Sequence, residues 1–307
     1  MTRKNTKTNR RTFLAQMGAT ATAVLVSTGI KPVNAREDLR ANKSLKFEVY
    51  DVFSAKRLKG NQLAVFRDAR GLSDKQLQEI ASEMNYSETT FVYPDDNGLY
   101  TNPVRTRIFT PFMELPFAGH PTLGTATAIR QWRDNADQVI LQLDVGEIPI
   151  NFEAEENGFV GTMSQIDPMF SDIHSAAEIA QIIGLDVSDV DMSIPPQSAT
   201  TGLSRILIML KNIDAVRRMK VDYEKLDRWN EGKEFHSRNV YAMTREVETG
   251  ADFRARMQLR GLRDDPVTGS SGGAAIASLV RHGMVPSGET VTIEQGLEIN
   301  RGGEMYV

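Results

Sequence analysis

Glu88 is the carboxylate whose sequence surroundings best suit acid–base chemistry. It lies within Ser87-Glu88-Thr89, where a predicted helix ends and an apolar strand begins. Partial burial at such a junction raises the pKa of a carboxylic acid toward neutral pH, where the group can both take and return a proton. The ordinary alternative is a solvated carboxylate at the end of a helix, and Glu88 alone does not decide between the two.

His120 stands at a predicted helix start, within Gly119-His120-Pro121. Proline suits the first turn of a helix, and the N–H groups exposed there attract anions. His120 could therefore donate to a substrate carboxylate or move a proton, although a helix-capping or core histidine is the alternative. The histidines lack the spacing of a metal site, so we predict no bound metal.

A second predicted helix start combines Asp265, which precedes Pro266, with Gly269 and Ser270. The N–H groups of Gly269 and Ser270, together with the Ser270 hydroxyl, can bind an anion, whereas a simple helix cap is the alternative. The segment lacks the Gly-x-x-x-x-Gly-Lys spacing of a phosphate loop, and no Gly-x-Gly-x-x-Gly follows a strand. Nucleotide binding is therefore not predicted.

The composition excludes several kinds of site. The chain of 307 residues has no cysteine, which rules out disulfides, thiol nucleophiles and cysteine-ligated metals. Its formal net charge of -4 at pH 7 gives no sign of a nucleic-acid partner.

Residues 1–35 have the order of a bacterial export signal. A basic stretch leads to Arg10-Arg11-Thr12-Phe13-Leu14, and an apolar run follows up to small residues that end at Ala35. Paired arginines before Phe-Leu resemble the twin-arginine type. We predict cleavage after Ala35, a flexible leader over residues 36–44, and a periplasmic or otherwise exported protein with no stable membrane anchoring. A basic tail with a short apolar helix is the alternative.

The rest of the chain alternates strands with helices. Helical spacing predicts helices over residues 73–85, 121–132, 175–185 and 274–281. Period-two patterns and short apolar runs predict strands over residues 45–53, 62–66, 89–93, 105–110, 139–143, 147–152, 159–163, 205–210, 239–244, 252–259, 291–294 and 304–307.

Two of these helices, those that follow Gly119 and Gly269, carry small residues on nearly every face, which is typical of a helix enclosed by a sheet. The two halves repeat one pattern. We predict an α+β fold of two pseudo-symmetric lobes, each a curved, mostly antiparallel sheet rolled around a central helix. The lobes span residues 45–138 and 139–294, and a C-terminal strand within 295–307 can return to the first lobe.

The order of short motifs resembles the PhzF-like family of phenazine-biosynthesis isomerases, over nearly all of residues 45–307. The motifs are Asp51-Val52-Phe53, Gly60-Asn61, Asn85-x-Ser87-Glu88-Thr89-Thr90-Phe91, Arg107-x-Phe109-Thr110-Pro111, Glu114-Leu115-Pro116-Phe117-x-Gly119-His120-Pro121-Thr122-Leu123-Gly124 and Asp265-Pro266-x-Thr268-Gly269-Ser270.

The resemblance implies a diaminopimelate epimerase-like fold and a proton shift between carbons of a cyclic amino acid without a cofactor. Glu88 takes the position of the family's acid/base. The positions of His120, Asp265 and Ser270 match substrate-orienting and proton-relay residues, while Gly119 and Gly269 match backbone donors to the substrate carboxylate. The epimerases of this fold use paired cysteines, which this chain lacks.

The chain departs from the family pattern at Gln62, where proline is usual, and at Asp264, where glutamate is common. These departures keep the named catalytic positions and leave the substrate open. We expect a cofactor-independent isomerase of a small carboxylate-bearing substrate, and the resemblance implies a homodimer. The alternative is an exported small-molecule-binding protein of the same fold without turnover, although binding alone would not need Glu88.

Overall fold

The computed structural model describes residues 44–155, 158–261 and 263–307. The predicted export signal and nearly all of the predicted leader lie outside the described residues. From Leu45 onward the chain forms one compact unit whose strands make two sheets of eight strands each. Among the described residues, no helix is long and apolar enough to cross a membrane.

The first sheet has the order β1-β2-β3-β4-β6-β7-β8, with β5 paired to β4. It carries the helices α3 (Asp74–Met84) and α4 (Gly119–Trp132). Its strands are β1 (Phe47–Val52), β2 (Asn61–Phe66), β3 (Glu88–Tyr93), β4 (Val104–Phe109), β5 (Glu114–Leu115), β6 (Gln138–Leu143), β7 (Gly146–Glu155) and β8 (Gly158–Met163).

The second sheet has the order β16-β15-β13-β12-β11-β10-β9, with β14 paired to β13. Its strands are β9 (Met169–Ile173), β10 (Gln197–Thr200), β11 (Arg205–Met209), β12 (Asn239–Thr244), β13 (Phe253–Leu259), β14 (Arg263–Asp264), β15 (Thr292–Gln295) and β16 (Gly303–Tyr306). The helical segments of this half are α5 (Ala176–Ile182), η2 (Val187–Asp189), α6 (Ile213–Arg218), α7 (Tyr223–Asn230), α8 (Gly269–Arg281) and η3 (Leu297–Ile299).

The strand pairings repeat. From β1 to β7 the successive neighbours are antiparallel, parallel, antiparallel, parallel and antiparallel, and the same series runs from β10 to β16. In both series the second parallel pair is joined through a small-residue helix, α4 in the first and α8 in the second. The predicted pseudo-symmetric α+β architecture is therefore confirmed, with α4 equivalent to α8.

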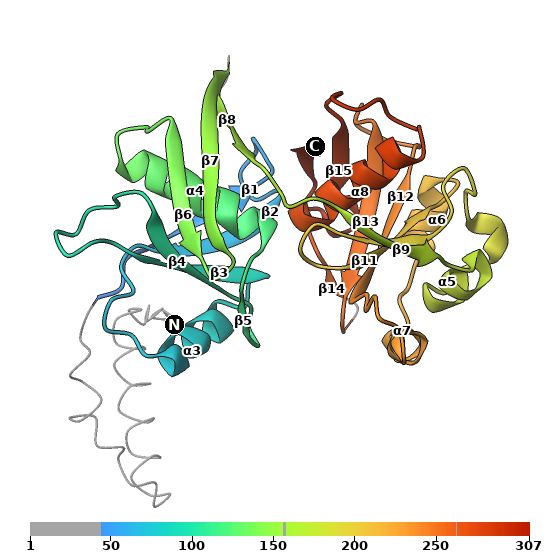
Figure 1. Ribbon diagram of the computed structural model, residues 1–307, viewed down its shortest axis with the longest axis horizontal. Helices are drawn as coiled ribbons and strands as arrows, with labels where there is room; N and C mark the ends of the chain where they lie inside the picture. The colour runs from blue at the N-terminus through green and yellow to red at the C-terminus, as the bar shows by residue number, and fades with distance from the viewer. Residues whose placement is uncertain (1–43, 156–157, 262) are drawn as a thin grey trace, which may run out of the picture. The chain divides into compact units, whose positions relative to one another are not determined.

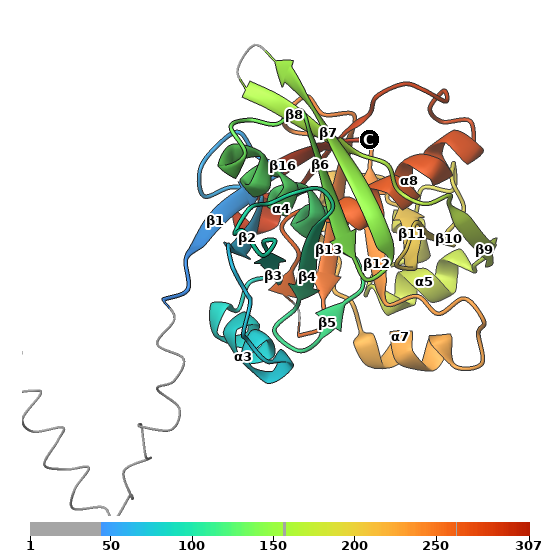
Figure 2. The same cartoon turned by 60° about the vertical axis from the view of Figure 1, so that its left-hand side comes forward.

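Each sheet is covered on both faces. In β2, Leu63 and Val65 pack in the cluster that contains α4, whereas Ala64 and Phe66 pack in the cluster that contains α3. Figures 1 and 2 show α3 and α4 on opposite sides of these strands. Because α4 is built from small residues, it approaches closely: a Cβ on Gly124 would lie 2.6 Å from Leu63 Cδ2.

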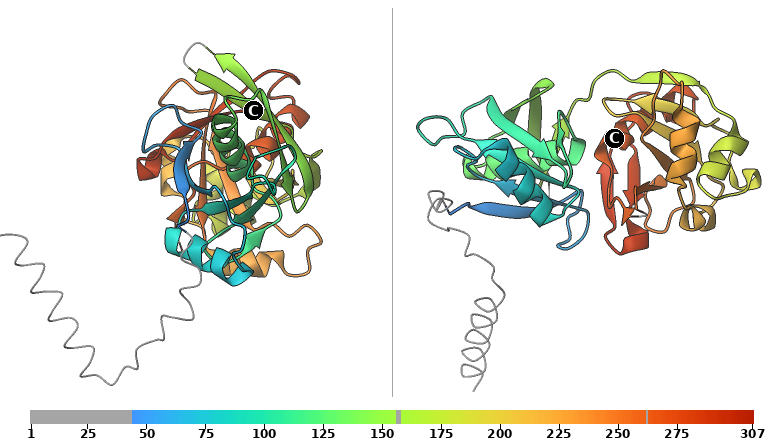
Figure 3. Two further views of the ribbon diagram at one scale, coloured as in Figure 1. Left: turned by 90° about the vertical axis from the view of Figure 1, so that its left-hand side faces the viewer. Right: turned by 90° about the horizontal axis from the view of Figure 1, so that it is seen from below.

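The second sheet has the same layering. Ile206 and Ile208 of β11 face a cluster that contains α5, α6 and α7, while Leu207 and Met209 face the cluster that contains α8. Figure 3 shows α5 and α7 away from α8. Alternate residues of β11 therefore point toward α8, and this face reaches the N-terminus of that helix.

The predicted boundary between the lobes at Gln138 needs correction. Strands β6, β7 and β8 extend the first sheet, and the chain enters the second sheet only after Met163. The physical reason is that α4 makes a crossover, so β6 returns parallel to β4 in the same sheet. A strand within residues 295–307 was also expected to return to the first lobe. It does not pair with the first sheet, because β16 pairs with β15 in the second sheet.

The segment before β16 nevertheless touches the β1–β2 turn. The Gly60 N–H donates to the carbonyl oxygens of Arg301 and Gly302 at 3.1 and 3.2 Å, and the Glu304 N–H donates to the Phe53 carbonyl at 2.9 Å. Arg301 Nη2 also lies 2.6 Å from Asp51 Oδ1. This turn, which ends at Asn61, is therefore held by residues near the C-terminal end.

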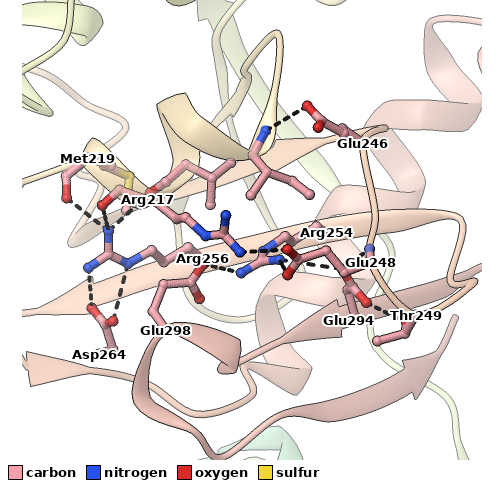
Figure 4. Close-up of polar contacts among 12 residues, drawn as sticks. Arg217, Met219, Glu246, Glu248, Thr249, Arg254, Arg256, Asp264, Glu294 and Glu298 are labelled. Atoms are coloured by element: carbon pink, nitrogen blue, oxygen red, sulfur yellow. Dashed lines mark hydrogen bonds and ion pairs between the residues drawn. The ribbon is translucent and has the colours of Figure 1, made fainter.

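A network of ion pairs crosses the second sheet (Figure 4). Arg254 on β13 is 1% exposed and contacts Glu248 and Glu298, each at 2.6 Å, with Glu294 at 3.9 Å. Arg256, two residues on, pairs with Asp264 at 3.1 Å and donates to three carbonyl oxygens at the end of α6. Each guanidinium in this network has its own carboxylate.

Candidate active site

Local sequence signals place Glu88 at the start of β3. Ser73 and Gln76 form a capping box at the start of α3, and the helix ends at Asn85, whose φ of 52° is left-handed. The chain then enters β3 at Glu88, opposite Leu63 on the parallel strand β2. The acid thus lies at the start of a central strand rather than on a solvated helix.

His120, the second residue of α4, faces Glu88. The distance from His120 Nε2 to Glu88 Oε2 is 3.6 Å, and the side chains are 6% and 17% exposed. Both of these atoms are buried and lack a hydrogen-bond partner. Buried polar atoms are nearly always paired, so two orphaned atoms that face each other indicate a place where a ligand or a proton belongs.

The protonation states follow from burial. Burial lowers the pKa of His120 to about 3, against the opposite effect of a hydrogen bond with the Gln62 backbone. Burial and, to a smaller extent, the neighbouring Asp265 carboxylate raise the pKa of Glu88 to about 8, against the opposite effect of Arg205 and Arg263. At neutral pH the imidazole is therefore neutral and Glu88 is close to its titration point, so the pair is not an ion pair.

Asp265 is fixed on both of its carboxylate oxygens. Asn61 Nδ2 donates to Oδ1 at 2.8 Å, and Thr268 Oγ1 donates to Oδ2 at 2.6 Å. Burial raises the pKa of Asp265 to about 6, and these two hydrogen bonds oppose that rise. Asp265 is therefore mainly ionised at neutral pH, and its charge favours the protonated form of Glu88.

The N-termini of α4 and α8 meet at the same place. A Cβ on Gly119 would lie 2.9 Å from the Ser270 backbone nitrogen, and a Cβ on Gly269 would lie 3.5 Å from the His120 nitrogen. The first distance is too short for a real Cβ, so only glycine at position 119 allows the two helix starts to approach this closely. Their unpaired N–H groups carry partial positive charge and can receive one carboxylate.

Five of the six residues singled out in the sequence are thus joined by short contacts, namely Glu88, His120, Ser270, Gly119 and Gly269. The sixth, Asp265, acts on Glu88 through its charge. Sequence reasoning treated Asn61 as a turn residue and missed Arg205 and Tyr241. The available signal was a charged or hydroxyl side chain within otherwise apolar strands. Among the described residues, no group of three or more His, Asp and Glu side chains could hold a metal ion.

Comparison with known proteins agrees with this geometry. Residues 50–307 match the family model described as phenazine biosynthesis-like protein. The trans-2,3-dihydro-3-hydroxyanthranilate isomerase of Pseudomonas fluorescens is 34% identical over 85% of this chain and 88% of its own length.

Solved structures are also similar. A phenazine biosynthesis protein of the PhzF family from Bacillus anthracis has a TM-score of 0.73 and 28% identity, covering 85% of this chain and 88% of its own. A hydroxyproline epimerase from Agrobacterium vitis, with a TM-score of 0.54 at 14% identity over 80% of each chain, shares the fold. With two matching lobes and buried titratable side chains where they meet, the chain belongs to the PhzF-like family of isomerases.

Proposed function

We propose that this protein moves a proton between two carbon atoms of a small, cyclic, amino acid-like carboxylate, with Glu88 as the acid/base. The observation that carries the proposal is the pair of buried, unpartnered atoms, Glu88 Oε2 and His120 Nε2, 3.6 Å apart. The substrate class is supported by the Pseudomonas relative, whose named substrate is a ring that carries a carboxylate.

The reaction needs no external reactant. The Glu88 carboxylate takes a proton from one carbon, the electron pair of that C–H bond shifts across an adjacent double bond, and protonated Glu88 returns the proton to another carbon. His120, which is neutral, can donate or accept a hydrogen bond as charge moves. The helix starts at Gly119 and Gly269 hold the substrate carboxylate throughout.

The proposal is tested by deuterium exchange. Wild type, Glu88→Gln and the matched control Glu83→Gln, an exposed acid on α3, are incubated in D2O with a panel of cyclic and unsaturated amino acids. We expect deuterium to enter one substrate carbon with wild type and the control, and the rate to fall by about 10³-fold in Glu88→Gln, because general acid–base groups contribute roughly 10²–10⁴-fold.

Full exchange by the Glu88→Gln variant would contradict the role of Glu88 as the acid/base. Clear binding of a panel member by wild type, without exchange at any carbon, would favour the alternative of a binding protein without turnover. The pH profile gives a second test: kcat/KM should rise with pH, reach half of its plateau near pH 8 and level off above that, because Glu88 must be ionised to act as a base.

We also propose export by the twin-arginine route, supported by Arg10 and Arg11 before Phe13-Leu14. The expected result is that the double change Arg10→Lys and Arg11→Lys keeps the protein out of the periplasmic fraction. The homodimer implied by the resemblance stays a prediction, which light scattering of the purified chain can check.

A further inference from the structure

Arg205 is a buried cation without a carboxylate of its own. Arg205 is 5% exposed, and among the described residues no carboxylate forms an ion pair with it. Its guanidinium makes one hydrogen bond, from Nη1 to the carbonyl oxygen of Ser204 at 2.9 Å, and Nε is buried without a partner. A buried charge without a counter-charge is strongly unfavourable in the folded state, so its retention points to a role in binding a ligand.

The position of Arg205 connects it to the active site. It begins β11 and shares the face of Leu207 and Met209, which point toward α8. The turn before it also contacts α8, since Thr201 Oγ1 lies 3.3 Å from the Ser270 carbonyl oxygen. The charge of Arg205 is felt by Glu88 and Asp265, whose pKa values it lowers.

Tyr241 adds a second orphaned group on the same face. On the parallel strand β12, Tyr241 lies opposite Leu207, which is two residues after Arg205 on β11. The side chain is fully buried, and its hydroxyl has no hydrogen-bond partner. Its charged neighbour is again Asp265, which together with burial raises the pKa of the Tyr241 hydroxyl. The hydroxyl is therefore neutral and can act as a donor.

The protein's own acids do not complete this pair. Both oxygens of Asp265 accept from Asn61 and Thr268, and Glu88 is largely protonated at neutral pH. Arg205 and Tyr241 are a cation and a neutral donor on one face of neighbouring strands, and both have unpartnered polar atoms. Such groups match a carboxylate, which accepts from a guanidinium in a planar, charge-assisted geometry.

We propose that Arg205 and Tyr241 form a second anion-binding subsite beside Glu88, and that the substrate carries a second carboxylate that binds there. The first carboxylate lies at the helix starts of Gly119 and Gly269, and the ring between the two presents its C–H bond to Glu88. This inference rests on the proposed function for the place of the substrate, and it adds the class of substrate: a cyclic dicarboxylate.

The test compares anions that differ only in the second carboxylate. Calorimetric titration of the full-length chain at pH 7.5 measures the Kd of benzoate and of its three dicarboxylate counterparts, phthalate, isophthalate and terephthalate. We expect at least one dicarboxylate to bind ten times more tightly than benzoate. Equal binding of benzoate and all three dicarboxylates by wild type would overturn the proposal without any variant.

Variants then locate the subsite. Arg205→Gln should bring the preferred dicarboxylate to the affinity of benzoate and change benzoate binding less than twofold, and Arg205→Lys should keep part of the preference. The control Arg228→Gln removes the same charge from the exposed face of α7 and should change neither affinity. A preference that survives in Arg205→Gln, or one that Arg228→Gln also removes, would count against the subsite.

The same titrations in Glu88→Gln separate this inference from the proposed function. A dicarboxylate preference that persists in Glu88→Gln, even where wild type shows no deuterium exchange, supports the subsite and rejects only the mechanism. Exchange by wild type on monocarboxylates alone, without dicarboxylate preference, supports the mechanism and rejects the subsite.

Discussion

Two buried arginines of the second sheet differ in their carboxylate partners. Arg254, in the network of Figure 4, contacts three glutamates, whereas Arg205 has no carboxylate among the described residues. Both are nearly inaccessible, at 1% and 5% exposure. The Nε of each guanidinium lacks a hydrogen-bond partner, so the two arginines differ in their carboxylates. The fold can surround an internal guanidinium with carboxylates, and it does so where the role is to join β13 to β15 and η3.

This difference separates the ion-pair network, which stabilises the fold, from the region proposed to carry out the chemistry. In the ion-pair network every charge has its counterpart, so removing one partner leaves others stranded. At the candidate active site, polar atoms of Glu88, His120, Arg205 and Tyr241 have no hydrogen-bond partner. Such atoms are unfavourable in the folded state, and a bound ligand would relieve that cost. The following predictions test this contrast, beginning with the largest effect.

Arg254→Met should destabilise the protein strongly. The change leaves Glu294 and Glu298, 1% and 9% exposed, without their cation. We expect the free energy of unfolding, measured by urea denaturation, to fall by about 3–5 kcal/mol. In the same assay Arg205→Gln should cost little, since it breaks no ion pair. If the two variants lost equal stability, the contrast between the regions would be wrong.

Glu88→Gln should change how stability depends on pH. Folding raises the pKa of Glu88 from an ordinary 4.5 to about 8, so the folded state holds the proton more tightly. That contribution is complete below pH 4.5 and is lost as pH rises through 8. The variant should therefore gain stability relative to wild type between pH 5 and 8.5, by at least about 1.4 kcal/mol. A constant difference, as expected for the exposed Glu83→Gln, would contradict the raised pKa.

Asp265→Asn should produce the smallest effect, a displaced pH profile. The Asp265 charge contributes to the raised pKa of Glu88, so its removal lets Glu88 ionise at lower pH. With each profile normalised to its own maximum, the rising limb of kcat/KM should move toward acid. An unchanged limb would mean that Asp265 acts on the substrate alone.

The elements that could be predicted from the sequence are those that form through interactions between residues close together in the chain. The capping box of α3 and the small-residue helices after Gly119 and Gly269 depend on neighbouring residues, and they led directly to Glu88, His120 and Ser270. The boundary at Gln138 failed because it depends on which strands pair. Arg205 and Tyr241 stood out only as polar side chains within apolar strands, because a strand pattern shows which residues share a face and not what that face meets.

The hydrogen bond from Asn61 to Asp265 spans 204 positions of the chain and defines the site as much as any catalytic group does. The β1–β2 turn, which ends at Asn61, is itself held by hydrogen bonds with the backbone around Arg301 and Glu304. During synthesis, Glu88 and His120 leave the ribosome long before these closing residues exist. Contacts between distant segments form slowly, so we expect competence for proton transfer to appear last, as a property of the finished chain rather than of either lobe.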